Sequence, residues 1–168
     1  MTTHIRKLSP PDAKALQALR LEALRTDPVA FASSYEEERV LSLEKVAERL
    51  IPTDDRAIVG AFDRGELVGL AAWHREELLK LAHKGFVWGV FVRDSHRGRG
   101  LARRLIEAVI ALARRCDGIL LLNLTTCATN QPAIALYESL GFVVYGRETA
   151  AICIDGTLHD DVHMALRL

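Results

Sequence analysis

The chain has 168 residues, of which 49% are hydrophobic and 26% are charged. This length favours a single domain over residues 1–168, because folds of this size bury roughly 70% of the surface that the unfolded chain exposes. The composition is that of an ordinary globular protein and excludes the disordered, collagenous and disulfide-dense classes. The 22 basic and 22 acidic residues cancel. No long-range field therefore recruits nucleic acid or an anionic membrane, and an anion site has to be built locally.

The cysteines and the N-terminal residues indicate the expected compartment. Cys116, Cys127 and Cys153 are an odd number without C-x-x-C spacing, which argues against a disulfide framework or a zinc knuckle. The N-terminus lacks the apolar core of a secretory signal, and no stretch reaches the ~18 apolar residues that span a bilayer. We expect a cytoplasmic protein with no metal site and with neither nucleic acid nor membrane as a partner.

Helical patterns dominate the first third of the chain and are followed by a hairpin. Ser9-Pro-Pro-Asp12 combines a cap residue, prolines and an acid, which is typical of a helix start. The expected elements are, in order, a short apolar start at Ile5, a helix with Leu16, Leu19 and Ala23 on one face that ends near Asp27-Pro28, a helical region from Ser34 to Ile51 with a break at Ser42, and a hairpin of Ala57 to Phe62 with Leu67 to His74.

The second half alternates strands and helices. The expected elements are a strand from Phe86 to Val92, a loop from Arg93 to Gly100, a helix that buries Leu101, Leu105, Ala108, Val109 and Leu112, a strand from Ile119 to Leu124, a helix from Asn130 to Leu140, and a hairpin of Phe142 to Ile154 with Thr157 to Leu168. The apolar run from Ile119 to Leu124 is typical of a strand covered on both faces. The order predicts a mixed α/β fold with one strand-helix-strand crossover at its centre.

An arginine-rich loop between the strand Phe86 to Val92 and the next helix is the most informative segment. From Arg93 to Arg104 it contains five arginines against one aspartate. Free backbone N–H groups at a helix start, together with the positive end of the helix dipole, make an anion site. Gly98 and Gly100 let a phosphate approach the backbone without a Cβ in the way. This local excess of positive charge in a neutral chain predicts a polyphosphate ligand.

The loop fails two phosphate-binding motifs and matches a third. A dinucleotide fingerprint would need glycine at Arg103, and a P-loop would need Lys-Ser or Lys-Thr after the glycines. The segment does match R-x-x-G-x-A, read as Arg97-Gly98-Arg99-Gly100-Leu101-Ala102, directly after a Val-Phe-Val strand. It thereby resembles the acyl-CoA pyrophosphate loop of GNAT-type N-acetyltransferases.

A second match lies about 30 residues downstream. The run Asn130-Gln-Pro-Ala-Ile-Ala-Leu-Tyr-Glu-Ser-Leu-Gly-Phe142 resembles the other signature of that family, in which an asparagine opens a helix and a tyrosine lies near its end. Seven residues are nearly two helical turns, so Asn130 and Tyr137 lie on one face with Ala133 and Ile134 and can line one cleft. Asn130 also fits a helix N-cap, and Tyr137 a packed aromatic whose hydroxyl lies at the rim.

The resemblance implies a GNAT-like acyl-CoA N-acyltransferase fold, an α/β domain whose mixed, largely antiparallel sheet has a central, splayed pair of parallel strands. It implies transfer of an acetyl group from the co-substrate acetyl-CoA to a primary amine of a small molecule or peptide, by direct attack in a ternary complex and without a metal. It assigns Tyr137 as the general acid toward the CoA sulfur. The residues that it assigns to cofactor binding are Phe91, Val92, Arg97, Gly98, Arg99, Gly100, Leu101, Ala102, Asn130 and Ala133.

Several alternatives stay open at this point. Phe91 and Val92 would offer backbone N–H groups from a bulged strand, but they also fit ordinary core positions. A non-catalytic acyl-CoA-binding or sensing module on the same fold is an alternative, because a fold does not fix a function. The presence of Tyr137 favours the enzyme, and a homodimer is left open.

The sequence identifies neither the general base nor the amine acceptor. The candidate bases are Glu36, Glu37, Glu38, Asp160, Asp161 and His83, each of which also fits a solvated charge. His96 is expected to face solvent, and His159 and His163 lie about 13 Å apart on a strand, too far for one metal. The segment Phe31 to Glu38 is the expected wall of a site for a small cationic or primary amine. Ser34 as an N-cap, with acids in the first helical turn, explains the same residues.

Overall fold

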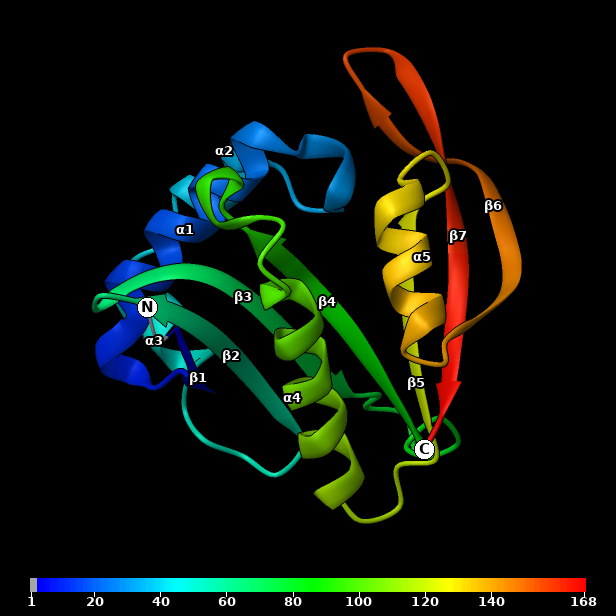
Figure 1. Ribbon diagram of the computed structural model, residues 1–168, viewed down its shortest axis with the longest axis horizontal. Coiled ribbons are helices and arrows are strands. Elements are labelled where there is room, and N and C mark those ends of the chain that lie inside the picture. Colours follow the sequence, from blue (N-terminus) through cyan, green and yellow to red (C-terminus); the bar gives the residue numbers. More distant parts are fainter. Residues whose placement is uncertain (1–2) are drawn as a thin grey trace.

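The computed structural model describes residues 3–168, and within that range seven strands form one mixed sheet with helices on both faces (Figure 1). The strands are β1 (His4–Lys7), β2 (Arg56–Asp63), β3 (Glu66–Arg75), β4 (Lys84–Val92), β5 (Leu121–Cys127), β6 (Val143–Ile154) and β7 (Thr157–Arg167). Their spatial order is β1-β2-β3-β4-β5-β7-β6, and β4 and β5 pair in parallel while the other neighbours are antiparallel. The predicted mixed α/β sheet with a central parallel pair is confirmed.

The sheet separates the core into two layers, and each layer is covered by helices. The helices are α1 (Ala13–Thr26), α2 (Tyr35–Arg39), α3 (Leu43–Glu48), α4 (Leu101–Arg115) and α5 (Gln131–Ser139), with 3₁₀ turns η1 (Pro10–Asp12), η2 (Pro28–Ala30) and η3 (Asp94–His96). Side chains of α4 and α5 pack on one face of the sheet, and side chains of α1 and α3 pack on the other. No helix within residues 3–168 is long and apolar enough to cross a membrane.

The predicted helix starts agree with the structure. The Ser9 N–H donates to the Asp12 carboxylate at 2.9 Å at the start of the first helical segment. The second helical region is broken where the sequence predicted, because Ser42 caps α3 by accepting a hydrogen bond from the Lys45 N–H at 3.3 Å. Such caps satisfy N–H groups that have no partner inside the helix.

The strand β5 differs from its prediction of burial on both faces. Its residues alternate, with Leu122 and Leu124 buried and Leu121, Asn123 and Thr125 half-buried. The buried face packs in the layer of α4 and α5. The other face stays partly open because β4 turns away from β5 after only three paired residues.

The divergence of β4 from β5 creates the space for a site. The two strands pair only over Lys84–Phe86 and Leu121–Asn123 and then separate, as Figure 1 shows between the green and yellow strands. On its other side, β4 has one extra residue between its pairings with Ala72 and Leu70 of β3. Gly89 lies in this bulge with a φ of +66°, a conformation that favours glycine. A bulge bends and twists a strand locally, which is how β4 leaves its parallel partner.

Candidate active site

A cleft of about 770 Å³ opens where β4 and β5 separate. This volume is in the range of small-molecule sites, which measure roughly 300–1,000 Å³. Its walls are formed by residues 86–92 of β4, residues 96–98 and 100–103 of the arginine-rich loop and α4, residues 124–127 of β5, α5 with its cap, and residues 29–33 before α2. The cleft therefore brings the two sequence signatures together on opposite sides of one space.

The glycine positions of the loop are built for an anion. Gly98 and Gly100 have φ values of +74° and +72°, and a Cβ at either position would meet no other atom within 4 Å. Their side of the loop is thus open to a ligand. The first backbone hydrogen bond of α4 runs from the Arg104 N–H to the Gly100 carbonyl at 3.2 Å. The N–H groups of Leu101 to Arg103 precede it and have no acceptor inside the helix.

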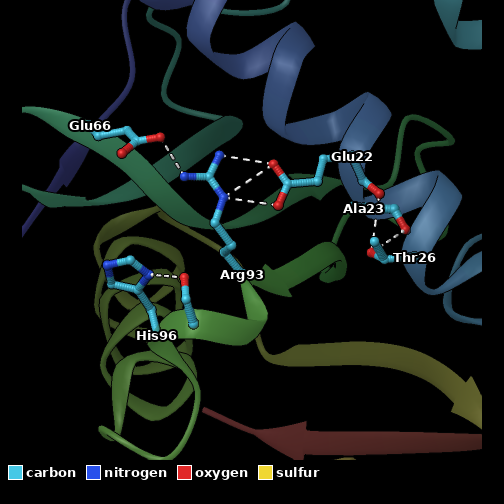
Figure 2. A network of polar contacts seen from close by, with 7 residues as sticks. Glu22, Ala23, Thr26, Glu66, Arg93 and His96 are labelled. Atoms are coloured by element: carbon cyan, nitrogen blue, oxygen red, sulfur yellow. Dashed lines mark hydrogen bonds and ion pairs between the residues drawn. The ribbon is translucent and has the colours of Figure 1, made fainter.

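Two of the loop arginines are held by carboxylates of the fold itself. Figure 2 shows Arg93 between Glu22 of α1, at 2.8 Å, and Glu66 of β3, at 2.5 Å. The hydrogen bonds that Arg93 donates, above all those to Glu22, raise the pKa of its guanidinium further above its usual range. Arg97 contacts Asp27 at 2.5 Å and Asp94 at 3.0 Å. The positive excess of the loop is therefore smaller in the fold than the sequence predicted.

The remaining loop arginines are divided between the cleft and the outer surface. Arg103 lines the cleft and donates to the Ser139 hydroxyl at 2.6 Å. Arg99 is exposed, donates to the Ser95 carbonyl at 3.1 Å, and is outside the cleft lining found within residues 3–168. The residues predicted for cofactor binding that do line the cleft are Phe91, Val92, Arg97, Gly98, Gly100, Leu101, Ala102, Asn130 and Ala133.

The backbone of Val92 faces the cleft, whereas that of Phe91 faces β3. The Arg93 N–H donates to the Val68 carbonyl of β3 at 2.9 Å. Residues along an antiparallel ladder alternate between facing their partner strand and facing away. Phe91, opposite Leu70, therefore turns its main chain toward β3, and Val92 turns away. The Val92 carbonyl accepts a hydrogen bond from Arg97 Nε at 2.9 Å, and by the same alternation the Val92 N–H also points away from β3.

The tyrosine and the asparagine of the second signature lie on the cleft wall formed by α5. Tyr137 is 6% exposed, and its ring meets Phe142 edge-on at 5.8 Å. Burial raises the pKa of the Tyr137 phenol to about 12, so the hydroxyl stays protonated at neutral pH. Asn130 Oδ1 accepts the Ala133 N–H at 3.2 Å, which confirms the N-cap interpretation, and Asn130 also lines the cleft.

The candidate bases lie elsewhere. Among residues 3–168, none of Glu36, Glu37, Glu38, His83, Asp160 and Asp161 lines the cleft. Glu37 is used in the cap of α2, where it accepts the Ser34 N–H at 2.8 Å, so the capping interpretation of Ser34 is confirmed. Phe31, Ala32 and Ser33 do line the cleft, so the segment predicted as an acceptor wall contributes its beginning and not its three acids.

Asp160 and Asp161 lie on β7, outside that lining. Asp160 pairs with Arg147 at 2.7 Å. Asp161 is buried, and burial, followed by the nearby charge of Glu148, raises its pKa. Asp160 therefore has a structural partner. Asp161 is a carboxyl with a raised pKa that lies opposite Cys127 of the neighbouring strand β5.

The prediction that His96 faces solvent is wrong. The η3 turn folds the loop back, so the His96 side chain is 16% exposed and its Nε2 lies 3.2 Å from Asp63 at the end of β2. His96 also lines the cleft. Among the described residues, no group of three or more His, Cys, Asp or Glu side chains is arranged to hold a metal ion.

Arg20 is the cleft residue that sequence reasoning missed. It lies on the sheet-facing side of α1, among Leu16, Leu19 and Ala23, and is 8% exposed. Its guanidinium stacks on the Phe31 ring at 4.5 Å. A signal was present, because the apolar stripe that predicted the helix places position 20 on the buried face, where an arginine is unusual.

The comparison with known structures identifies the fold first. A GNAT-family acetyltransferase from Streptococcus pneumoniae superposes with a TM-score of 0.90 and 24% identity, covering 99% of this chain and 100% of that one. A second structure, of yncA from Salmonella typhimurium with its cofactor acetyl-CoA, superposes with a TM-score of 0.82 and 23% identity, covering 100% and 95%. At these identities the likeness defines the fold.

The sequence comparison then defines the family. Residues 17–142 match the Acetyltransferase (GNAT) family, and the chain belongs to that family. Streptothricin acetyltransferase of Escherichia coli is 36% identical over 99 residues, which are 55% of this chain and 51% of that protein. L-2,4-diaminobutyric acid acetyltransferase of Marinococcus halophilus is 35% identical over 79 residues, 46% and 45% of the two chains. The matched segments thus span about half the length of these relatives.

Proposed function

We propose that the protein is an acetyl-CoA-dependent N-acetyltransferase that acetylates a primary amine by direct attack in a ternary complex. The observation that carries the proposal is the cleft between β4 and β5, which has the open glycine loop at one end and a protonated tyrosine on its wall. The first-turn N–H groups of α4 would bind the pyrophosphate of CoA. The Val92 N–H, directed away from β3, would bind the thioester carbonyl or the pantetheine arm.

The reaction needs no covalent enzyme intermediate. The amine nitrogen forms a bond to the acetyl carbon, the C–S bond breaks, and CoA leaves as a thiol. The nitrogen loses one proton, and the departing sulfur gains one. Tyr137 can make the second transfer because its hydroxyl is protonated at neutral pH and it lies on the wall of the cleft. Its place on the cleft wall supports the role that the family resemblance gives it.

The names of the relatives support an amine acceptor. Streptothricin acetyltransferase and L-2,4-diaminobutyric acid acetyltransferase are named for their acceptors, and the second name describes a diamino acid. Other matches are N-terminal acetyltransferases, including the NAA20 subunit of Arabidopsis thaliana. These acceptors differ in size, so the relatives support the reaction class and leave the acceptor to be found.

Release of free thiol from acetyl-CoA in the presence of a panel of primary amines tests this function. We expect thiol release that depends on both the amine and the protein, with a one-to-one yield of N-acetylated product. Binding of acetyl-CoA without turnover by any amine would instead support a non-catalytic acyl-CoA sensor on the same fold.

A further inference from the structure

Arg20 has polar groups that the fold leaves without partners. Its Nε and Nη1 atoms are buried and make no hydrogen bond within residues 3–168. Burying a polar group without a partner costs free energy, and the cost is larger for a charged group. Since Arg20 lines the large cleft, a ligand in that cleft can supply the acceptors that its guanidinium lacks.

The surroundings of Arg20 orient one end of the guanidinium toward the β4 bulge. Phe31 and Trp88 lie 4.5 Å and 6.0 Å from its central carbon. A Cβ at Gly89 would lie 4.0 Å from Arg20 Nη1, so this nitrogen lies next to the bulge. The bulge lies three residues before Val92, which lines the same cleft. An acceptor bound by Arg20 would therefore lie close to the proposed thioester position.

The local charge balance calls for an anion. The nearest carboxylate is Glu38, whose Oε1 lies 3.9 Å from Arg20 Nε, beyond hydrogen-bond distance. Arg49 already binds Glu38 at 3.0 Å. Two guanidinium groups thus share one carboxylate in a largely apolar wall. A guanidinium stays charged inside proteins, so this cluster has two positive charges against one negative, and the charge of Arg20 is the more buried of the two positive ones.

Of the two cavities that Arg20 lines within residues 3–168, the large cleft is the one with room for an organic anion. The cavity on the other side of Arg20, next to Glu38 and Arg49, has a volume of about 20 Å³. A space of that size holds roughly one water molecule. It has no room for a carboxylate with its attached carbon atoms.

We infer that the amine acceptor carries a carboxylate that Arg20 binds, so the substrate class is amino acids or similar amines with a nearby carboxylate. This inference rests on the proposed function. The flat guanidinium fork matches the two oxygens of a carboxylate and can bind them with two parallel hydrogen bonds. Phe31 and Trp88 would contact the apolar part of the same acceptor.

Matched acceptors test the inference on the unmodified protein. Each proteinogenic amino acid is compared with its own amide and with its decarboxylated amine, using thiol release and correcting kcat/KM for the fraction of neutral amine. We expect the best amino acid to exceed its amide and its amine by roughly 10- to 100-fold, the effect of losing hydrogen bonds to a charged group. Equal use of all three would overturn the inference while leaving the proposed function intact.

Variants test whether Arg20 is responsible for that preference. In Arg20→Gln, kcat/KM for the amino acid should fall roughly 10- to 100-fold, while the amide and acetyl-CoA keep their KM values within about threefold. Arg20→Lys retains the charge without the fork and should be intermediate. Arg25→Gln is the control, because Arg25 lies on the same helix, stacks on Tyr35 at 4.7 Å and is exposed. The control should keep the preference unchanged.

A binding measurement gives a result even without turnover. N-acetyl amino acids carry the carboxylate of the expected product, and calorimetric titration can compare them with N-acetyl amino acid amides. We expect the carboxylates to bind the wild type. They should bind Arg20→Gln more weakly, by a factor of roughly ten or greater. Equal binding of carboxylates and amides, or a loss confined to acetyl-CoA affinity, would overturn the inference. Absence of thiol release with every amine, together with retained carboxylate binding, would contradict the proposed function instead.

Discussion

The two walls of the cleft use arginine in opposite ways. On the loop wall, Arg97 is paired with a carboxylate of the fold, as is Arg93 at the start of the loop, and the groups left for a ligand are backbone N–H groups and open glycines. On the α1 wall, Arg20 is buried with two nitrogens that lack partners among the described residues. The sequence predicts the anion site on the first wall because the loop there is rich in arginine. The partners of each guanidinium, and not the number of arginines, distinguish a structural cation from one available to a ligand.

The largest expected effect concerns Tyr137, on the wall formed by α5. Tyr137→Phe removes only the hydroxyl and should lower kcat by roughly 10²- to 10⁴-fold, the usual contribution of a general acid. The affinity for acetyl-CoA should stay nearly unchanged, because the ring keeps its packing against Phe142. Steady-state kinetics and acetyl-CoA titration measure the two effects. An unchanged kcat, under conditions where chemistry limits turnover, would reduce Tyr137 to a packing role.

The next effect tests the backbone site of the loop wall. Gly100→Val puts a branched side chain at a φ of +72° and on the open side of the loop, so acetyl-CoA should bind roughly 10- to 100-fold more weakly. Gly65→Val is the matched control, with a φ of +84° and equally open surroundings in the β2–β3 turn. Both variants should lose stability. An equal loss of acetyl-CoA affinity in both variants would show that backbone strain, and not the loop site, accounts for the loss.

A smaller effect distinguishes Arg97, which pairs with carboxylates, from Arg99, which donates to a backbone carbonyl. Arg97→Ala removes the hydrogen bond to the Val92 carbonyl and the contact to Asp27, and should weaken acetyl-CoA binding roughly tenfold. Arg99→Ala removes a solvent-exposed charge and should change binding less than about threefold, with a difference that disappears at high salt. Calorimetric titration at two salt concentrations measures both. A larger loss in Arg99→Ala would place the phosphate contact on the outer surface of the loop.

The smallest effect concerns a paired arginine far from the cleft. Arg6 donates to Asp12 at 2.8 Å and, as the largest cause, lowers the pKa of that carboxyl from 3.8 to about 2. A lowered pKa stabilises the folded state above pH 4, and this contribution is lost as the pH falls toward 2. Arg6→Ala should cost about 1 kcal/mol at pH 7, after discounting for solvent around the 42% exposed Arg6 side chain.

Denaturant unfolding of wild type and Arg6→Ala at pH 7 and at low pH measures this contribution. The difference in free energy of unfolding should shrink as the pH falls, and acetyl-CoA affinity should not change. A difference that stays constant across this range would mean that Arg6 acts through its stacking on Phe62 at 4.1 Å instead of through Asp12.

Sequence patterns were sufficient to predict the order of the helices and of strands β2 to β7, and the presence of two family signatures, whereas β1 was expected only as a short apolar start. The element order follows from local signals, namely the Ser9 and Ser42 caps and the apolar periodicity of α4. The glycine loop and Tyr137 were predicted because short motifs encode them. These features depend on residues close together in the chain, where spacing translates directly into geometry.

The partners of charged side chains could not be predicted in the same way. Arg93 meets Glu22 71 positions away, and His96 meets Asp63 33 positions away. Arg20 lines the cleft together with Trp88, which lies 6.0 Å away at the β4 bulge and 68 positions along the chain. Such contacts depend on how distant segments pack, which a single sequence does not specify.

Acetyl-CoA binding tests the central claim most directly, namely that the splayed cleft is an acyl-CoA site. Thermal unfolding of the wild-type protein should be measured with acetyl-CoA, NAD and ATP, each in ~100-fold excess over the dissociation constant of acetyl-CoA. Linkage then predicts roughly 2.7 kcal/mol of stabilisation and a rise in Tm of roughly 5 to 10 °C with acetyl-CoA. NAD and ATP should give much smaller shifts. An equal shift with NAD and none with acetyl-CoA would contradict the account.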